Sequence, residues 1–321
     1  MAIGEISSVL VGINAVIVAL GPDGPGVFTA AGDSGRALPF GPFAPEADGT
    51  LERALRRFVA DQTPFELGYV EQLYTFGDQG RNSVRAGGEP HFISVGYLAL
   101  TRPVSADASG GFSPWYRFFP WEDWREGRPT IIDEVIAPRL KIYAKAGKSE
   151  PKQKQRMERA RLCFGLDGLT FDDEKVLERY ELLYEAGLVA EASRDTHLGD
   201  GSDQSDDAHS LTGPAMAIDH RRVLATAISR LRAKIKYRPI IFELMPPTFT
   251  LTELQKAVEA IAGAKVHKQN FRRLIDKSGL VEGTGRKVTQ TGGRPAEQFR
   301  FRPEAVRERL NPGVRLPGRR G

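Results

Sequence analysis

The sequence contains very little cysteine, and its histidines are few and scattered. Cys163 is the single cysteine among 321 residues, which excludes an internal disulfide and a cysteine-rich metal cluster. The five histidines include no closely spaced pair of metal ligands. We therefore expect no metal centre, and we expect the Cys163 side chain to pack in a core.

A long apolar run is also missing. A membrane helix needs roughly 18 apolar residues, and the longest candidate, residues 9–20, is shorter and is interrupted by Gly12 and Asn14. The N-terminal residues lack the basic region of a signal peptide. These absences predict a cytoplasmic protein without membrane association.

The overall composition is ordinary, with 40% hydrophobic and 27% charged residues, which excludes global disorder. The length predicts two domains, because one domain usually takes about 100 to 200 residues. The charge is uneven: residues 1–219 carry 22 basic and 33 acidic side chains, net −11, whereas the remainder carries 23 and 8, net +15. Such a basic domain is typical of one that binds a polyanion, usually nucleic acid, although a basic surface can also serve solubility alone.

The first part reads as an α+β domain. Strand patterns occur at residues 6–20, 27–30, 69–75 and 92–100, and a helical pattern occurs at residues 50–62. Helical patterns continue at residues 131–146, 153–163 and 172–186, the last with a possible capping box at Thr170–Asp173. The three tryptophans gather in residues 112–124, where a small core or interface is favoured over ligand stacking.

The basic part has the element order of a winged helix-turn-helix. We expect a first helix at residues 221–236, a second that begins with the capping box Thr250–Glu253 and ends at Gly263, and a third at residues 267–278. The third helix should bury Phe271, Leu274 and Ile275. Two strand patterns around a glycine-rich basic tip follow within residues 280–301 and predict a wing.

The chemistry of these residues suits a DNA duplex. Arginine and glutamine on the third helix can read base edges in the major groove, while basic side chains on the wing neutralise phosphates. For Asn270, a structural role as a cap or a core hydrogen-bonding group is an equal alternative. The predicted contact residues are Lys268, Gln269, Asn270, Arg272, Arg273, Arg286, Lys287 and Arg294.

With these residues in place, the chain resembles the Nudix-related transcriptional regulators of NAD metabolism. The similar segments are 217–220, 231–237, 249–255, 270–273, 293–296 and 299–301, with 71–78 and 96–100 in the first part. The resemblance implies an α+β fold: a Nudix-like α/β/α sandwich at residues 1–215, followed by a winged helix-turn-helix domain at residues 216–321. The helical extension at about 103–214 resembles the alphaproteobacterial branch of this family.

The motif of active Nudix hydrolases is degenerate in this sequence. Its helical glutamates hold the magnesium ions that activate water at a diphosphate. When the motif is anchored on Arg56, these three positions are occupied by Arg57, Ala60 and Asp61, while Asp48 falls at the upstream glutamate. We therefore expect no catalysis and no metal site.

The resemblance implies a repressor of genes for NAD synthesis or salvage, acting as a homodimer on a palindromic operator in double-stranded DNA. It implies no required cofactor and an effector that is ADP-ribose, NAD or another adenine nucleotide. The candidate effector contacts, each of which can equally be an ordinary core or surface residue, are Arg36, Arg56, Phe76, Asp78 and Arg81. Two alternatives stay open: a divergent diphosphate hydrolase with an accessory nucleic-acid-binding domain, and an RNA-binding or protein-interaction module.

Overall fold

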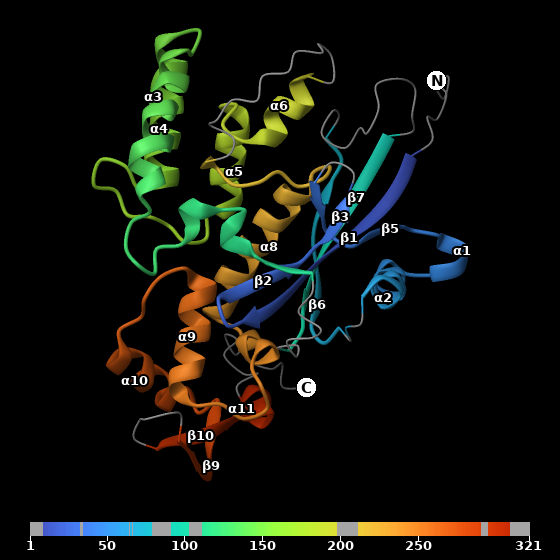
Figure 1. Cartoon of the computed structure of the whole chain (residues 1–321), viewed down its shortest axis with the longest axis vertical. Coiled ribbons are helices and arrows are strands. Elements are labelled where there is room, and N and C mark those ends of the chain that lie inside the picture. The colour runs from blue at the N-terminus through green and yellow to red at the C-terminus, as the bar shows by residue number, and fades with distance from the viewer. Residues whose placement is uncertain are drawn as a thin grey trace, which may run out of the picture.

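A mixed sheet forms the centre of the first part of the molecule (Figure 1). The structure is a computed structural model and describes residues 9–32, 35–63, 65, 67–78, 91–102, 111–197, 211–289 and 295–308. Within these residues the strand order is β6-β7-β1-β2-β8, with β5 paired to β1. Its strands are β1 (Val9–Gly21), β2 (Gly24–Phe28), β5 (Phe40–Pro42), β6 (Val70–Phe76), β7 (His91–Leu100) and β8 (Phe112–Pro114). Among the described strands of this sheet, β1 and β7 run parallel and the other pairs are antiparallel. Beside it, β3 (Ala30–Gly32) forms a separate small hairpin with β4 (Gly35–Ala37).

The long strand β1 has a core on both of its faces. Its side chains alternate between the two faces because successive residues of a strand point in opposite directions. Ile13, Ala15 and Ile17 join one core, whereas Val16 and Val18 join the other. This double burial explains why the sequence here is almost continuously apolar rather than alternating.

One face of the sheet is covered by α2 (Leu51–Gln62), which follows the short α1 (Pro45–Asp48). Thr50 caps α2, because its Oγ1 accepts a hydrogen bond from the backbone N–H of Arg53 at 3.2 Å. The helix buries Leu55, Phe58 and Val59 against the sheet, as its apolar spacing predicts.

The opposite face of the sheet is covered by α8 (His220–Ile235). The close approach of this helix depends on Gly96 in β7, since an added Cβ would lie 3.1 Å from Val223 and 3.2 Å from Phe76. The sequence predicted this helix as the first of the DNA-binding domain. In the structure α8 contacts α9, but its apolar side chains also belong to the core that covers the sheet. The helix is therefore packed as part of the first, sheet-containing part of the molecule.

The extension between the sheet and α8 is helical. It comprises η2 (Trp115–Arg117), η3 (Pro120–Glu122), η4 (Ile132–Ile136), α3 (Ala137–Lys145), α4 (Glu150–Phe164), α5 (Val176–Glu185) and α6 (Ala190–His197). The helical pattern at residues 131–146 is confirmed. It contains a π-helical stretch at Ile132–Ile136 ahead of α3, where Pro138 lacks the backbone N–H of a regular helical hydrogen bond. One sequence prediction needs correction here. The capping box at Thr170–Asp173 does not form, since α5 begins only at Val176 and has no side-chain cap.

The aromatic cluster of the extension is core material. Trp115 and Trp121 are completely buried, and Cys163 packs in the same core. This confirms the packing interpretation of the tryptophans and of the cysteine. Among the described residues, no helix combines the length and the apolar character that crossing a lipid bilayer requires.

The C-terminal part lies at one end of the molecule (Figure 1). It comprises η5 (Ile240–Leu244), α9 (Leu251–Ala262), α10 (Lys268–Ser278), β9 (Val281–Val288), β10 (Ala296–Phe301) and α11 (Pro303–Glu308). Its buried side chains belong to the same continuous core as α8 and the extension.

Candidate nucleic-acid interface and effector site

The helices of the C-terminal part begin and end where the sequence places their caps. Thr250 and Glu253 form a reciprocal capping box at the start of α9, with the Glu253 carboxylate accepting from the Thr250 backbone N–H at 2.7 Å. Gly263 ends α9 in the left-handed conformation. These caps confirm the predicted second helix.

The wing is tied to the segment in front of α9. Phe249 and Phe299 exchange two backbone hydrogen bonds, of 3.0 and 2.7 Å, so that β10 pairs with this segment as well as with β9. The Phe242 ring of η5 stacks on Phe301 with ring centroids 4.3 Å apart. Together these contacts hold η5, α9 and the wing in one unit.

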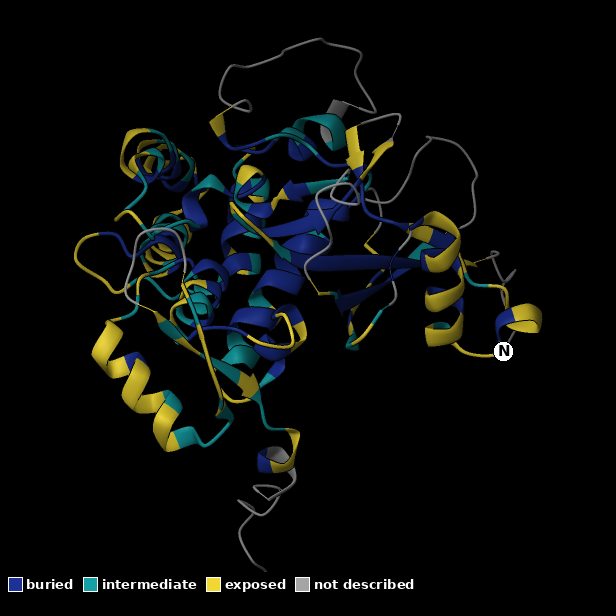
Figure 2. Cartoon of the chain, turned by 60° about the horizontal axis from the view of Figure 1, so that its bottom comes forward, coloured by how far each residue is buried: buried dark blue, intermediate teal, exposed yellow. Residues whose placement is uncertain are grey.

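The third helix of this unit, α10, is exposed along almost its whole length (Figure 2). Phe271 is its one buried residue. The predicted contact residues Lys268, Gln269, Asn270, Arg272 and Arg273 are all exposed. The predicted burial of Leu274 is wrong, because this side chain is 61% exposed.

Three of the cations of α10 are free, within the part of the chain that the structure describes, to meet a polyanion. Within the described residues, no ion pair or hydrogen bond engages the side chains of Lys268, Arg272 and Arg273. The same holds for Asn270, which is exposed and caps no helix, so the structural alternative for this residue loses its basis. The exposed surface of α10 thus presents hydrogen-bond donors next to the apolar side chain of Leu274.

The wing adds positive charge next to α10. Arg286 and Lys287 are exposed near the end of β9, on a strand rather than on the expected loop. Arg294 falls outside the described residues.

Three predicted effector residues surround the first turn of α8. Phe76 is buried under the guanidinium of Arg222, whose carbon lies 5.2 Å from the ring centroid, and Asp78 forms an ion pair with the same arginine. Arg36 lies on β4 and pairs with Met216, just before α8 begins. The end of β6, the residues that follow it and the start of α8 therefore lie close together.

Arg222 at this place is a residue that sequence reasoning missed. Its guanidinium also pairs with Glu181 at 2.6 Å and with Asp219 at 3.3 Å, so three carboxylates meet one cation. The signal in the sequence was a charged residue two positions after residues 217–220, a segment that is similar to the family.

The other two predicted effector residues do not join this group. Arg56 lies on α2, across the sheet from α8, where it pairs with Glu52 at 2.9 Å and donates to the Leu67 carbonyl at 3.1 Å. Arg81 falls outside the described residues.

The residues at the Nudix-motif positions are engaged in a structural ion pair. Arg57 donates to the buried carboxylate of Asp48 at 2.7 and 3.0 Å, and the backbone N–H of Ala44 donates to the same carboxylate. The hydrogen bond from Arg57 holds the pKa of Asp48 below its usual value. Ala60 and Asp61 are exposed on the outer side of α2. Within the described residues, no three metal-binding side chains gather at one place.

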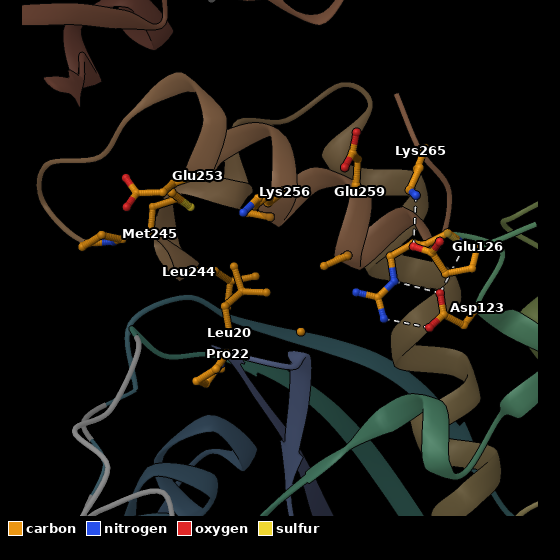
Figure 3. A pocket seen from close by; sticks show the side chains of 16 residues that line it. Leu20, Pro22, Asp123, Glu126, Leu244, Met245, Glu253, Lys256, Glu259 and Lys265 are labelled. Atoms are coloured by element: carbon orange, nitrogen blue, oxygen red, sulfur yellow. Dashed lines mark hydrogen bonds and ion pairs between the residues drawn. The ribbon is translucent and has the colours of Figure 1, made fainter. Parts of the chain in front are cut away.

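A cleft of about 590 Å³ separates the tip of the β1–β2 hairpin from α9 (Figure 3). Leu20 and Pro22 of the hairpin face Leu244 and α9 across it, and Asp123 stands at one end. Arg125, which also lines the cleft, pairs with Asp123 at 2.7 Å. The cleft therefore lies between the sheet and the C-terminal unit.

Comparisons with known proteins agree with this geometry. Residues 241–301 match the family described as the NrtR DNA-binding winged helix domain. The C-terminal part of the chain is thus similar to the NrtR DNA-binding winged helix domain. This domain contains η5, α9, α10 and both strands of the wing, and the match begins after α8, in line with the packing of that helix on the sheet.

The chain is also similar to a known repressor and to two solved structures. The ADPR responsive transcriptional repressor NtrR of Acinetobacter baylyi is 44% identical over 86 residues, which cover 27% of this chain and 34% of the relative. The chain thus matches about a third of the length of that protein.

Two crystal structures of NrtR from Shewanella oneidensis, one of them complexed with a 27mer DNA, share the fold of nearly the whole chain. Each has a TM-score of 0.51 and covers 92% of this chain, at 18% and 19% identity, with 95% and 96% of the Shewanella chains covered. This likeness shows that the chain shares the overall fold of these structures, in agreement with the predicted α+β domain followed by a winged helix.

Proposed function

We propose that this protein is a sequence-specific, DNA-binding transcriptional regulator, a repressor of genes for NAD synthesis or salvage. The observation that carries the proposal is α10. This exposed helix lies in the segment that matches the NrtR winged helix, and its Lys268, Arg272 and Arg273 side chains have no partner within the described residues. Base edges in the major groove accept hydrogen bonds from such donors, and the exposed Leu274 suits a thymine methyl group.

The regulator is proposed to act in the cytoplasm as a homodimer on a palindromic operator. Winged helices commonly bind as symmetric pairs, each reading one half-site. The net charge of +15 beyond residue 219 favours association with DNA, and the relative from Acinetobacter is described as a repressor. We place the boundary between the two domains near residues 236–239, after α8, rather than at the predicted residue 215, since α8 packs on the sheet.

The proposed effector is an adenine nucleotide, with ADP-ribose as the first choice. The Acinetobacter relative is described as responsive to ADPR. Phe76, Asp78 and Arg36 lie near the start of α8, where the charged groups of Asp78 and Arg222 suit the hydroxyl and phosphate groups of such a nucleotide, while the Phe76 ring is buried beneath Arg222. An effector changes occupancy of the operator only if it binds the DNA-competent and DNA-incompetent states with different affinity.

The Nudix-like domain is proposed to be catalytically inactive. The ion pair of Arg57 with Asp48 occupies the upstream carboxylate with a cation of the protein itself. A dinuclear magnesium site needs several free carboxylates at this place. Incubation with ADP-ribose and magnesium should release no AMP, and release at the rate of an active Nudix hydrolase would contradict the proposal.

Selection of bound duplexes from a random DNA library tests the function directly. It is run without ligand and with ADP-ribose, NAD or ATP. We expect enrichment of a palindrome whose yield changes with one nucleotide. If no duplex sequence is enriched under any condition, the regulatory function is wrong, and RNA binding or nucleotide hydrolysis takes its place.

A further inference from the structure

The C-terminal end of α9 docks into the first domain through its last carbonyl groups. Tyr116 of η2 donates its hydroxyl to the Ala260 carbonyl at 2.6 Å, and Arg232 of α8 donates its Nε–H to the Ile261 carbonyl at 3.0 Å. The backbone N–H of Trp124 donates to the Gly263 carbonyl at 2.7 Å. The last carbonyls of a helix have no partner within the helix, so donors from three other segments complete this one.

Arg232 also supplies the charge that α9 lacks. The C-terminal end of a helix carries a partial negative charge, which a cation stabilises. The last turn of α9 contains no basic residue, and the fully buried guanidinium of Arg232 takes that place.

The guanidinium of Arg232 is itself held in position by the buried carboxylate of Glu122. Arg232 lies 2.6 Å from this carboxylate, and Arg179 of α5 lies 2.5 Å from it. Burial alone would raise the pKa of Glu122, but the two guanidinium groups hold it below its usual value, so that the carboxylate stays charged. The orientation of Arg232 is thus fixed from both sides.

The fit around Gly263 leaves no room for a side chain. A Cβ at this position would overlap the Glu122 carbonyl oxygen and would lie 2.7 Å from Arg232 and 2.9 Å from Tyr116. The end of α9 therefore packs so closely against the first domain that one added carbon atom at Gly263 would disturb the contact.

The position of α9 is passed on to α10 through a braced turn. The Glu259 carboxylate accepts from the Val266 backbone N–H and from the Gln255 amide, each at 2.9 Å. The same amide donates to the Val266 carbonyl at 3.0 Å. Since this turn leads directly into α10, a displacement of the end of α9 displaces α10 with it.

We propose that Tyr116, Glu122 and Arg232 form a socket that holds the end of α9 and thereby sets the position of α10 for reading DNA sequence. They act as positioning residues through α9 and not by touching DNA. The inference rests on the proposed function. Base-edge contacts need an exact placement of donors, whereas phosphate contacts tolerate displacement. Damage to the socket therefore lowers affinity for the operator more than affinity for random duplex DNA.

A matched pair of glycine variants tests the socket in the full chain. Gly263 and Gly187 both follow a helix with positive φ, 71° and 69°, but a Cβ at Gly187 meets nothing within 4 Å. Both alanine variants bear the cost of the left-handed backbone, and Gly263→Ala alone disturbs the socket. We expect Gly263→Ala to lower the ratio of operator to random-duplex affinity by about tenfold or more, and Gly187→Ala to leave it within about twofold.

A second pair removes single hydroxyl groups, in case Gly263→Ala does not fold. Tyr116→Phe deletes the bond to Ala260, while Tyr97→Phe deletes a bond of another buried tyrosine, to Gln72 on the far face of the sheet. With similar melting temperatures, only Tyr116→Phe should lower the affinity ratio, by about threefold to tenfold.

The outcomes separate the two proposals. An unchanged ratio in Tyr116→Phe, with a wild-type protein that prefers its operator, overturns the socket and leaves the regulatory function standing. A wild-type protein without any sequence preference overturns the function, and the socket with it.

Discussion

His220, the first residue of α8, shows how burial sets the chemistry of one side chain. The ring is 1% exposed, and its Nδ1 accepts a hydrogen bond from the Leu38 backbone N–H at 3.0 Å. Burial, assisted by the nearby positive charge of Arg194, lowers the pKa of His220 from 6.5 to about 3. The folded protein therefore holds this histidine neutral, and it links β4 to the start of α8.

This histidine makes stability depend on pH. Its folded pKa lies below its unfolded value, so the unfolded chain takes up a proton first, and stability is lost as pH falls from 6.5 towards 3. Between pH 7.5 and 5.5 the free energy of unfolding should fall by about 1.4 kcal/mol more in the wild type than in His220→Gln. Denaturant titrations at both pH values measure this difference. Equal pH dependence of the two proteins would contradict the assignment.

At the scale of an element, α10 differs most from its sequence prediction. Apolar spacing predicted that Phe271, Leu274 and Ile275 all face the core, yet only Phe271 is buried and Ile275 is partly buried. The helix contacts α9 and β9 along a narrow strip, which leaves Leu274 on the outer surface beside Arg273. Periodicity cannot separate an apolar residue that faces a core from one that faces a ligand.

Substitutions on α10 should therefore act on DNA binding and not on folding. Arg272→Ala, Arg273→Ala and Leu274→Ala should change the free energy of unfolding by less than about 0.5 kcal/mol, because these side chains are exposed. Each should weaken operator binding by about 1 kcal/mol or more. Lys141→Ala, which removes an exposed cation from α3, is the control and should leave binding unchanged. Operator affinity that is unaffected by all three substitutions would exclude α10 as the reading helix.

At the scale of the whole molecule, α8 connects the two proposed sites. Its first turn meets Phe76 and Asp78 through Arg222, and its last turns hold α9 through Arg232. The winged helix and the sheet share one continuous core, so the winged helix is fixed to the first domain by packing and by the socket together. A nucleotide bound at the proposed effector site would therefore contact the same helix that holds the end of α9.

A fragment of residues 237–321 tests this dependence. Without the first domain, the carbonyls at the end of α9 lose the donors from Tyr116, Trp124 and Arg232. The isolated fragment should melt at a lower temperature than the full chain and bind operator and random duplexes with nearly equal affinity. Its steep salt dependence should remain, since phosphate neutralisation alone produces it. A fragment with the stability and the sequence preference of the full chain would contradict the role of the first domain.

Much of this molecule is determined by local sequence. The strands of the sheet, the caps of α2 and α9, the wing and the exposed cations of α10 follow from apolar spacing, capping residues and charge. Such features depend on residues a few positions apart, so the sequence contains all the information that they require.

Only the tertiary structure decided what depends on residues far apart in the chain. The side of the sheet on which Arg56 lies, the exposure of Leu274 and the double role of α8 follow from packing between elements. The socket joins residues 116, 122 and 232 to the end of α9, and no local pattern predicts that meeting. The burial of Arg232 on α8 was not predicted either, because the free energy of a buried ion pair depends on groups that the fold alone brings together.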